Sequence, residues 1–363
     1  MTGARSPALG RRRLGNLLLG EHPQAEDQGA EQVATWLGAL QAQDLGSGLW
    51  SLGARLPGST ISDMHAAVAA GTVLRTWPMR GTIHFIPSRD ARWMLATTGE
   101  LAFRGVHARW EYLGIDEATV HRGAEVLRQA LTGGHRLTRK QANEVLRDAG
   151  LNSDGQRGYH MVWYASQVGV TCLGPNEGKD QTVVLLDEWA PDQVTRDHDD
   201  ALRELALRFV RSHGPVTSAD FARWTGLGVR AARAAIRAND DAVTEVDLDG
   251  VPYWTAAEEL EPVSGVVVLP GFDEFMLGYK DRSAMLADEH KQQIVPGNNG
   301  VFRATVVADG EVVATWKRTA RAAADVIAVT EFVPLSARNR KRVTAAFAPY
   351  SHYLDRPLDI RFE

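Results

Sequence analysis

Cysteine, metal-binding motifs and long apolar runs are scarce or absent in this 363-residue sequence. The single cysteine, Cys172, excludes an internal disulfide framework and a cysteine-built zinc site, and it fits a reducing, cytoplasmic compartment. No apolar run approaches the ~18 residues needed to span a bilayer, so we expect no membrane partner. The 11 histidines contain no H-x-x-x-H pair, and no phosphate loop or triad motif is present. We therefore expect no metal and no cofactor, and a metabolic enzyme is disfavoured.

The N-terminus has the outline of a signal peptide without its length. A basic cluster at 11–13 precedes a leucine-rich stretch at 14–19, but Gly15 and Asn16 interrupt the stretch and Glu21 follows it at once. We interpret this segment as the first helix.

Lysine is also scarce, and the net charge is −5. That charge argues mildly against a nucleic-acid partner, because phosphate contacts need local positive charge. Only six of the 40 basic residues are lysine and 34 are arginine, the better fork for phosphate. The same bias also arises in a GC-rich genome, so it leaves both interpretations open.

The strongest local pattern lies at 212–257. Thr217 and Asp220 form a capping box that begins a helix, and a second helix, rich in Ala and Arg, runs from Val229 to Asn239. Alternating apolar residues on both sides of Asp249-Gly250 then indicate a β-hairpin. Helix, turn, helix and hairpin is the winged-helix arrangement.

The same order occurs twice earlier in the chain. Thr138 and Gln141 form another capping box, which begins a second copy. Its helices run toward 150 and over 159–166, and its hairpin strands are 168–173 and 182–186. The looser first copy has helices across 27–43 and 47–56 and strands at 73–77 and 82–86. Three copies of one unit suggest an array.

After residue 262 the sequence becomes rich in β-branched runs separated by Gly, Asn and Asp turns. One helix is expected over 335–354, and a last strand at 360–362. The predicted fold class is therefore α+β, with tandem winged-helix units followed by a small, mostly antiparallel, β-barrel-like domain. The predicted divisions are 1–125, 126–198, 199–262 and 263–363.

Two glutamines, Gln41 and Gln43, follow an amphipathic helix. On a continuing helix their side chains would point about 200° apart, but in an extended segment side chains two apart face the same way. The Asp, Gly and Ser residues at 44–48 favour ending the helix near Ala42, so both amides could converge on one spot. From their spacing alone, the simpler interpretation is that the two glutamines cap the end of a helix. Asp44 is also expected to act as a helix cap.

Four blocks of the sequence resemble the bacterial winged-helix DNA glycosylases of the AlkZ and YcaQ type: Leu37–Asp44, Leu74–His84, Val246–Trp254 and Leu269–Arg282. The similarity runs over nearly the whole chain. It implies tandem winged helices with a C-terminal β-barrel, and a catalytic motif of glutamine, an aliphatic residue, and glutamine or aspartate. Gln41 and Gln43 match the glutamine form of the AlkZ branch, which includes enzymes of antibiotic self-resistance, and Ala42 takes the aliphatic position.

The chemistry of glutamine limits what such a site can do. An amide is no general base near neutral pH, but it can orient a water molecule and stabilise a sugar that becomes oxocarbenium-like. That is sufficient only for a base that leaves easily, such as a cationic N7- or N3-alkylated purine. The expected function is a monofunctional DNA repair glycosylase for such purines, interstrand crosslinks included. The expected partner is double-stranded DNA carrying these lesions, and the expected state is a monomer. The alternative is a non-catalytic winged-helix regulator.

Several basic and amide side chains are candidates for DNA contact. The arginines either lie on a solvated surface or contact DNA phosphates, and the sequence leaves both interpretations open. Asn298 and Asn299 lie in a long turn that either probes a groove or is an ordinary hairpin loop. His84, which alternates with apolar neighbours, is expected at the surface. Asp273 and Glu274, close to the charged residues of Tyr279–Arg282, are candidates for acid/base work, but a local ion-pair network that links domains is favoured. The basic candidates are Arg80, Arg139, Lys140, Arg157, Arg230, Arg233 and Arg237.

Overall fold

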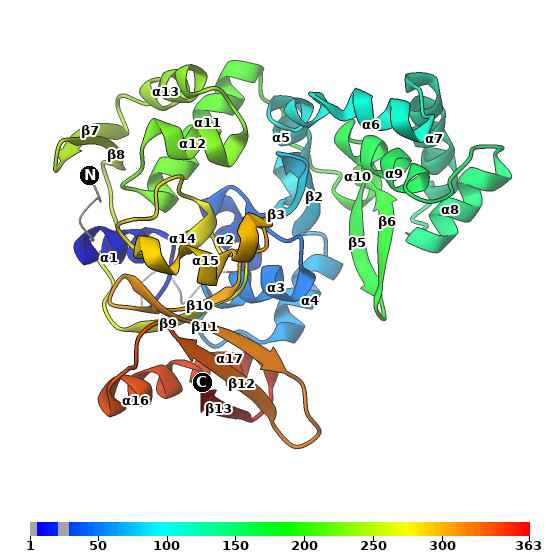
Figure 1. Ribbon diagram of the computed structural model, residues 1–363. Helices are drawn as coiled ribbons and strands as arrows, with labels where there is room; N and C mark the ends of the chain where they lie inside the picture. The colour runs from blue at the N-terminus through cyan, green and yellow to red at the C-terminus, as the bar shows by residue number, and fades with distance from the viewer. Residues whose placement is uncertain (1–5, 21–28) are drawn as a thin grey trace.

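A computed structural model describes residues 6–20 and 29–363 of the chain (Figure 1). Four groups of elements follow one another along the chain. In Figure 1 the first group, blue to cyan, lies mainly at the centre and reaches the second group through α6; the second group lies to the right, the third at the upper left, and the C-terminal sheet below.

The first group confirms the helices and the strand pair expected near the N-terminus, with two differences. The helix expected across 27–43 ends at Leu37, because Gly38 has a φ of +79° and turns the chain; residues 27 and 28 lie outside the described residues. A short strand, β1, and the helices α4, α5 and α6 were not among the predicted elements. The elements are α1 Pro7–Asn16, α2 Ala30–Leu37, β1 Leu40–Gln41, α3 Leu45–Gly53, α4 Ile61–Ala69, β2 Val73–Met79, β3 Thr82–Pro87, η2 Ser88–Asp90, α5 Ala91–Thr97, η3 Gly99–Phe103 and α6 Val106–Leu113.

The second group confirms the capping box at Thr138, whose side chain accepts from the amide of Gln141 while the Gln141 side chain accepts from the Thr138 amide. The expected hairpin forms, but its first strand begins at Thr171 because the preceding helix reaches Gln167. The elements are α7 Glu117–Leu131, β4 Leu137–Thr138, α8 Arg139–Asp148, α9 Arg157–Gln167, β5 Thr171–Glu177, β6 Asp180–Leu185 and α10 Leu186–Trp189.

The hairpins of the first two groups join into one sheet. Its strand order is β1-β3-β2-β5-β6-β4, and β2 meets β5 antiparallel with Arg75 opposite Leu173. This sheet crosses the predicted boundary between residues 125 and 126. The four-part division of the chain therefore stays a prediction. Within the shared sheet, β1 forms one edge.

The third group matches the expected order of helix, helix and hairpin. Asp249 and Gly250 both have positive φ, 55° and 80°, as a tight two-residue hairpin turn requires. Its hairpin forms a separate two-stranded sheet. The elements are α11 His198–His213, α12 Ser218–Thr225, α13 Val229–Arg237, β7 Val243–Leu248 and β8 Val251–Ala256.

The C-terminal group contains the expected β-rich domain, as a curled sheet of five strands in the order β13-β12-β11-β10-β9. In that order the sheet is open, and its last strand pairs parallel to β12. Phe347 separates two helices where one was expected. The elements are β9 Val266–Leu269, α14 Glu274–Leu277, η4 Asp288–His290, α15 Lys291–Ile294, η5 Pro296–Asn298, β10 Ala304–Ala308, β11 Glu311–Thr319, β12 Asp325–Glu331, α16 Ala337–Ala346, α17 Ala348–Leu354 and β13 Leu358–Phe362.

One connected cluster of buried apolar side chains runs through all four groups. The short helix α14 is buried along its whole length. The shared cluster packs the first and last groups on each other. Within residues 6–20 and 29–363, no helix has the length and apolar character to cross a membrane.

Candidate active site

The glutamine segment is an edge strand followed by a helix start. Gln41 ends β1, with its Cα opposite His84 of β3. The chain then bends at Gln43, and Asp44 has extended backbone angles, φ −94° and ψ 119°. Asp44 caps α3 by accepting a hydrogen bond from the Ser47 amide at 2.8 Å, as expected. The predicted extended form is thus found at Gln41 and Asp44 but is interrupted by the bend at Gln43. The preceding helix ends at Leu37, five residues before Ala42, where the sequence favoured its end.

Main-chain hydrogen bonds hold the middle of the segment. The Ala42 amide donates to the carbonyl of Ile83 at 2.8 Å, and the Ala42 carbonyl accepts from Nη2 of Arg75 at 2.9 Å. The Ile83 amide donates to Oε1 of Gln43 at 3.2 Å. The side chain of Gln43 therefore accepts the amide hydrogen bond of the neighbouring strand, and its amide group is oriented by β3.

The two glutamines differ in exposure. Gln41 is only 9% exposed, whereas Gln43 is exposed to solvent. The amide oxygen of Gln43 has a second lone pair beyond the one that Ile83 uses. Gln43 is therefore the member of the pair that offers an oriented acceptor to a molecule from outside, whereas Gln41 is buried.

Ala42 is fully buried against α3 and β3. A Cβ atom added to Gly48 of α3 would lie 2.7 Å from the Cβ of Ala42 and 3.1 Å from the ring of Phe85. This close approach explains why the aliphatic position holds the smallest aliphatic side chain, because a larger one would collide with α3.

Arg75 was missed by the sequence analysis. It is 4% exposed in β2, and burial lowers its pKa to about 10, while the nearby Asp44 carboxylate acts to raise it. A charged side chain inside an otherwise apolar strand, Val73–Met79, is the signal that could have found it. It positions the motif by its bond to Ala42.

His84 is fully buried, so its expected surface position was wrong. β3 is covered on both sides, so alternation along the strand does not separate an inside from an outside face. Burial, followed by the charge of Arg80, lowers the pKa of His84 to about 3, which keeps its ring neutral. Nη2 of Arg80 lies 3.3 Å from Nε2 of His84. Arg80 is therefore turned partly inward, a placement that does not favour its predicted contact with DNA.

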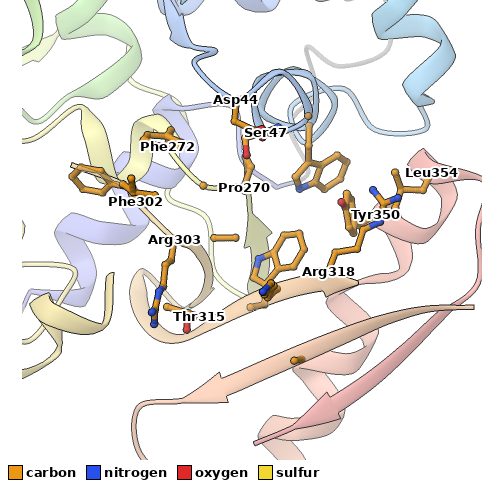
Figure 2. Close-up of a pocket in the computed structure, with 18 of the residues that line it drawn as sticks. Asp44, Ser47, Pro270, Phe272, Phe302, Arg303, Thr315, Arg318, Tyr350 and Leu354 are labelled. Carbon is orange, nitrogen blue, oxygen red and sulfur yellow. Dashed lines mark hydrogen bonds between the residues drawn. The ribbon is translucent and has the colours of Figure 1, made fainter. Parts of the chain in front are cut away.

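An open cleft of about 1000 Å³ begins beside the motif, between the start of α3 and the C-terminal sheet (Figure 2). Asp44 and Ser47 line its rim on the α3 side. Aromatic and cationic side chains line the rest, a combination that suits bases and phosphates. They include Trp50, Phe272, Phe302, Arg303, Trp316, Lys317, Arg318 and Tyr350.

The predicted DNA contacts occupy separate places. Three exposed arginines of α13, Arg230, Arg233 and Arg237, form what we call the α13 arginine row. Arg139 and Lys140 are exposed at the start of α8, at the opposite end of the molecule from α13 (Figure 1). All five are placed to meet a large ligand, and their contact with DNA stays a prediction.

Arg157 is less available, because its Nε donates to the Leu113 carbonyl at 2.7 Å. Asn298 and Asn299 are exposed, but their segment forms the short helical turns α15 and η5 and not a plain hairpin loop. Its continuation, Val301–Arg303, lines the cleft. The two asparagines therefore lie near the cleft, and their role also stays a prediction.

The chain was then compared with known proteins. Residues 34–353 match a family described as AlkZ-like DNA glycosylases. An interstrand DNA cross-link repair glycosylase of Streptomyces sahachiroi is 28% identical over 313 residues, which cover 79% of this chain and 82% of that protein. The solved structure of Streptomyces sahachiroi DNA glycosylase AlkZ superposes with a TM-score of 0.81 at 23% identity, and covers 99% of this chain and 100% of that one. The chain belongs to the AlkZ-like DNA glycosylase family.

Proposed function

We propose that this protein is a monofunctional glycosylase that hydrolyses the N-glycosidic bond of N7- and N3-alkylated purines in double-stranded DNA, interstrand crosslinks included. The observation that carries the proposal is the oriented, solvent-exposed amide of Gln43, next in the chain to Asp44, which lines an open cleft. Family membership supplies the reaction type. The name of the Streptomyces relative supports the crosslink substrate.

The proposed role of Gln43 is to accept a hydrogen bond from the attacking water and hold it below C1′ of the target nucleotide. Gln41 contributes its amide dipole to the developing positive charge on the sugar. Neither side chain can remove a proton near neutral pH. The site therefore requires a base that is already cationic and leaves as a neutral molecule.

The open cleft supports the crosslink part of the proposal. A snug pocket that encloses a flipped base cannot enclose one that is tethered to the opposite strand. A cleft of about 1000 Å³ that is open to solvent leaves space for the tether and its partner base. We propose that the helix–helix–hairpin units act as winged helices that hold the duplex on either side, with the α13 arginine row as one phosphate contact.

The test uses duplexes that carry one N7-methylguanine, one N3-methyladenine, one crosslinked guanine pair or one uracil. Abasic sites are detected by strand cleavage in alkali. The proposal expects release of the cationic purines and unhooking of the crosslink, with uracil left in place. Binding to a preferred sequence without release of any base would contradict it and favour a transcription regulator.

A further inference from the structure

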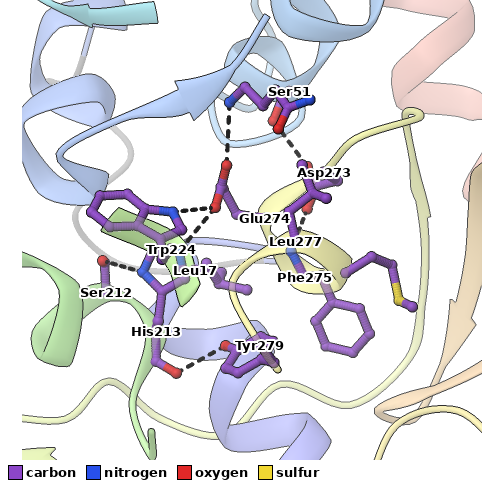
Figure 3. Close-up of polar contacts among 12 residues, drawn as sticks. Leu17, Ser51, Ser212, His213, Trp224, Asp273, Glu274, Phe275, Leu277 and Tyr279 are labelled. Atoms are coloured by element: carbon purple, nitrogen blue, oxygen red, sulfur yellow. Dashed lines mark hydrogen bonds and ion pairs between the residues drawn. The ribbon is translucent and has the colours of Figure 1, made fainter. Parts of the chain in front are cut away.

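The buried acidic pair Asp273-Glu274 lies directly behind the glutamine segment, although it is more than 200 residues away in sequence. The two side chains are 1% and 0% exposed. They form the domain-linking ion-pair network that the sequence predicts, but with different partners from those expected. Figure 3 shows the two carboxylates pointing to different sides of α14, with Asp273 toward Ser51 and Glu274 toward Trp224 and His213.

Asp273 performs a structural task. Its two oxygens accept from both terminal nitrogens of Arg55, at 2.8 and 3.0 Å, and one also accepts from Ser51. All three side chains are buried. This bidentate ion pair joins the N-cap of α14 to the turn that follows α3, and none of its hydrogen bonds reaches the glutamine segment.

Glu274 contacts the glutamine segment itself. Its Oε1 accepts the main-chain amide of Gln41 at 3.2 Å. Its Oε2 accepts from Nε1 of Trp224 at 2.9 Å and lies 3.3 Å from Nε2 of His213. One carboxylate therefore joins the edge strand of the first group to the helices of the third.

Strand pairing explains why Gln41 needs this partner. Ala42 bonds to β3, so the amide of Gln41, one residue earlier, points away from β3 at the sheet edge. An edge amide that is buried and has no partner is costly. Glu274 supplies the acceptor that a further strand would otherwise give.

The charge of Glu274 is well suited to this task. Burial acts to raise its pKa, but the hydrogen bond from His213, with the charge of Arg80 nearby, holds the pKa below its usual value. An ionised carboxylate is acceptor-only, and a hydrogen bond to a charged acceptor is stronger than one between neutral groups. The hydrogen bond to the Gln41 amide is therefore charge-assisted.

We propose that Glu274 is a positioning residue, which fixes the main chain at Gln41 so that the side chains of Gln41 and Gln43 meet the nucleotide in a productive geometry. This inference rests on the proposed glycosylase function. It adds that docking of the third group, through Trp224 and His213, holds the catalytic segment in place.

The experiment compares Glu274→Ala and the isosteric Glu274→Gln with Asp273→Asn as the matched control. All are assayed well below their melting temperatures, with saturating enzyme on an N7-methylguanine duplex. Misplacing a reacting group by about 1 Å can cost about 100-fold in rate, so we expect that loss for Glu274→Ala with duplex Kd unchanged within about twofold. Glu274→Gln keeps one acceptor oxygen but replaces the other by an NH₂ group, which faces partners that are themselves donors. A smaller loss of excision rate, about tenfold, is expected. Asp273→Asn should lower the melting temperature but keep the rate.

A second readout does not depend on excision. Hydrogen exchange of the Gln41 amide should be slow in the wild type and in Asp273→Asn, and at least tenfold faster in Glu274→Ala. A wild-type rate in Glu274→Ala, or an equal loss of rate in Asp273→Asn at equal stability, would overturn the positioning role. A wild-type protein that releases no base would instead overturn the proposed function, and the exchange data would still decide whether Glu274 holds the strand.

Discussion

Replacing Gly48 by alanine tests how closely the glutamine segment is packed on α3. The added methyl would lie 2.7 Å from the Cβ of Ala42, 3.0 Å from its Cα and 3.1 Å from the ring of Phe85, where ordinary contacts begin at 3.4 Å. Two of these neighbours belong to Ala42 itself, which cannot rotate away. The segment must therefore move by several tenths of an ångström.

The size of the effect follows from two opposing contributions. Overpacking a core costs about 1–3 kcal/mol, and the rigid neighbours favour the upper end. Alanine inside a helix is about 1 kcal/mol more favourable than glycine, and Gly48 lies within α3. We expect a net loss of about 2 kcal/mol of stability. The excision rate should fall by about 10- to 100-fold, because the motif is displaced.

The assay pairs thermal unfolding with single-turnover excision on an N7-methylguanine duplex. Gly46→Ala is the stability control, because its new Cβ would meet only Asp44, at 3.7 Å, and should leave stability equal or slightly higher. The double variant Gly48→Ala, Ala42→Gly removes the closest contact and should recover part of the rate. Full activity and stability in Gly48→Ala alone would refute the packing argument.

Three further predictions concern neighbouring residues. Arg75→Met leaves the buried Ala42 carbonyl without its donor, which costs about 1–3 kcal/mol of stability. The excision rate should fall about tenfold or more at unchanged duplex Kd. A wild-type rate would contradict the positioning role of Arg75. The pKa of His84 is about 3 when folded and about 6.5 when unfolded, so the unfolded chain binds this proton first and stability falls as pH drops from 6.5 to 3. His84→Gln should reduce the stability lost between pH 7 and pH 5 by about 2 kcal/mol, measured by denaturant unfolding at both values, and an unchanged loss would refute this. Replacing the α13 arginine row by alanine should weaken binding to all duplexes alike and lower the salt slope by about 3, whereas an unchanged slope would exclude phosphate contact.

Local signals predicted the elements well where they are self-contained. The capping boxes at Thr138 and Thr217 and the turn at Asp249-Gly250 begin or join elements as expected, because each depends on residues three or fewer apart. The end of α2 was misplaced, because the left-handed conformation of Gly38 is set by its surroundings.

Long-range pairing was beyond the sequence. The hairpins of the first two groups form one sheet through a contact between β2 and β5, nearly 100 residues apart. His84 was misjudged for the same reason, since a strand covered on both sides shows no alternation between surface and core. The parallel pairing of β13 also depends on tertiary packing.

The candidate site was predictable in part. A helix end close to the glutamines and the capping by Asp44 followed from spacing and residue type. The partners that hold the segment, Arg75 and Glu274, did not, because each bond joins residues that are distant in the chain. Only the folded molecule shows that the carboxylate of Glu274 accepts a hydrogen bond from the Gln41 amide at the edge of β1.

The most direct test of the account is the single-turnover excision rate of Gln43→Ala on an N7-methylguanine duplex, measured together with duplex affinity. The account predicts that excision is lost while the Kd stays within about twofold of wild type, because Gln43 orients water and contributes little to holding the duplex. Excision at the wild-type rate by this variant would contradict the catalytic role of the glutamine segment.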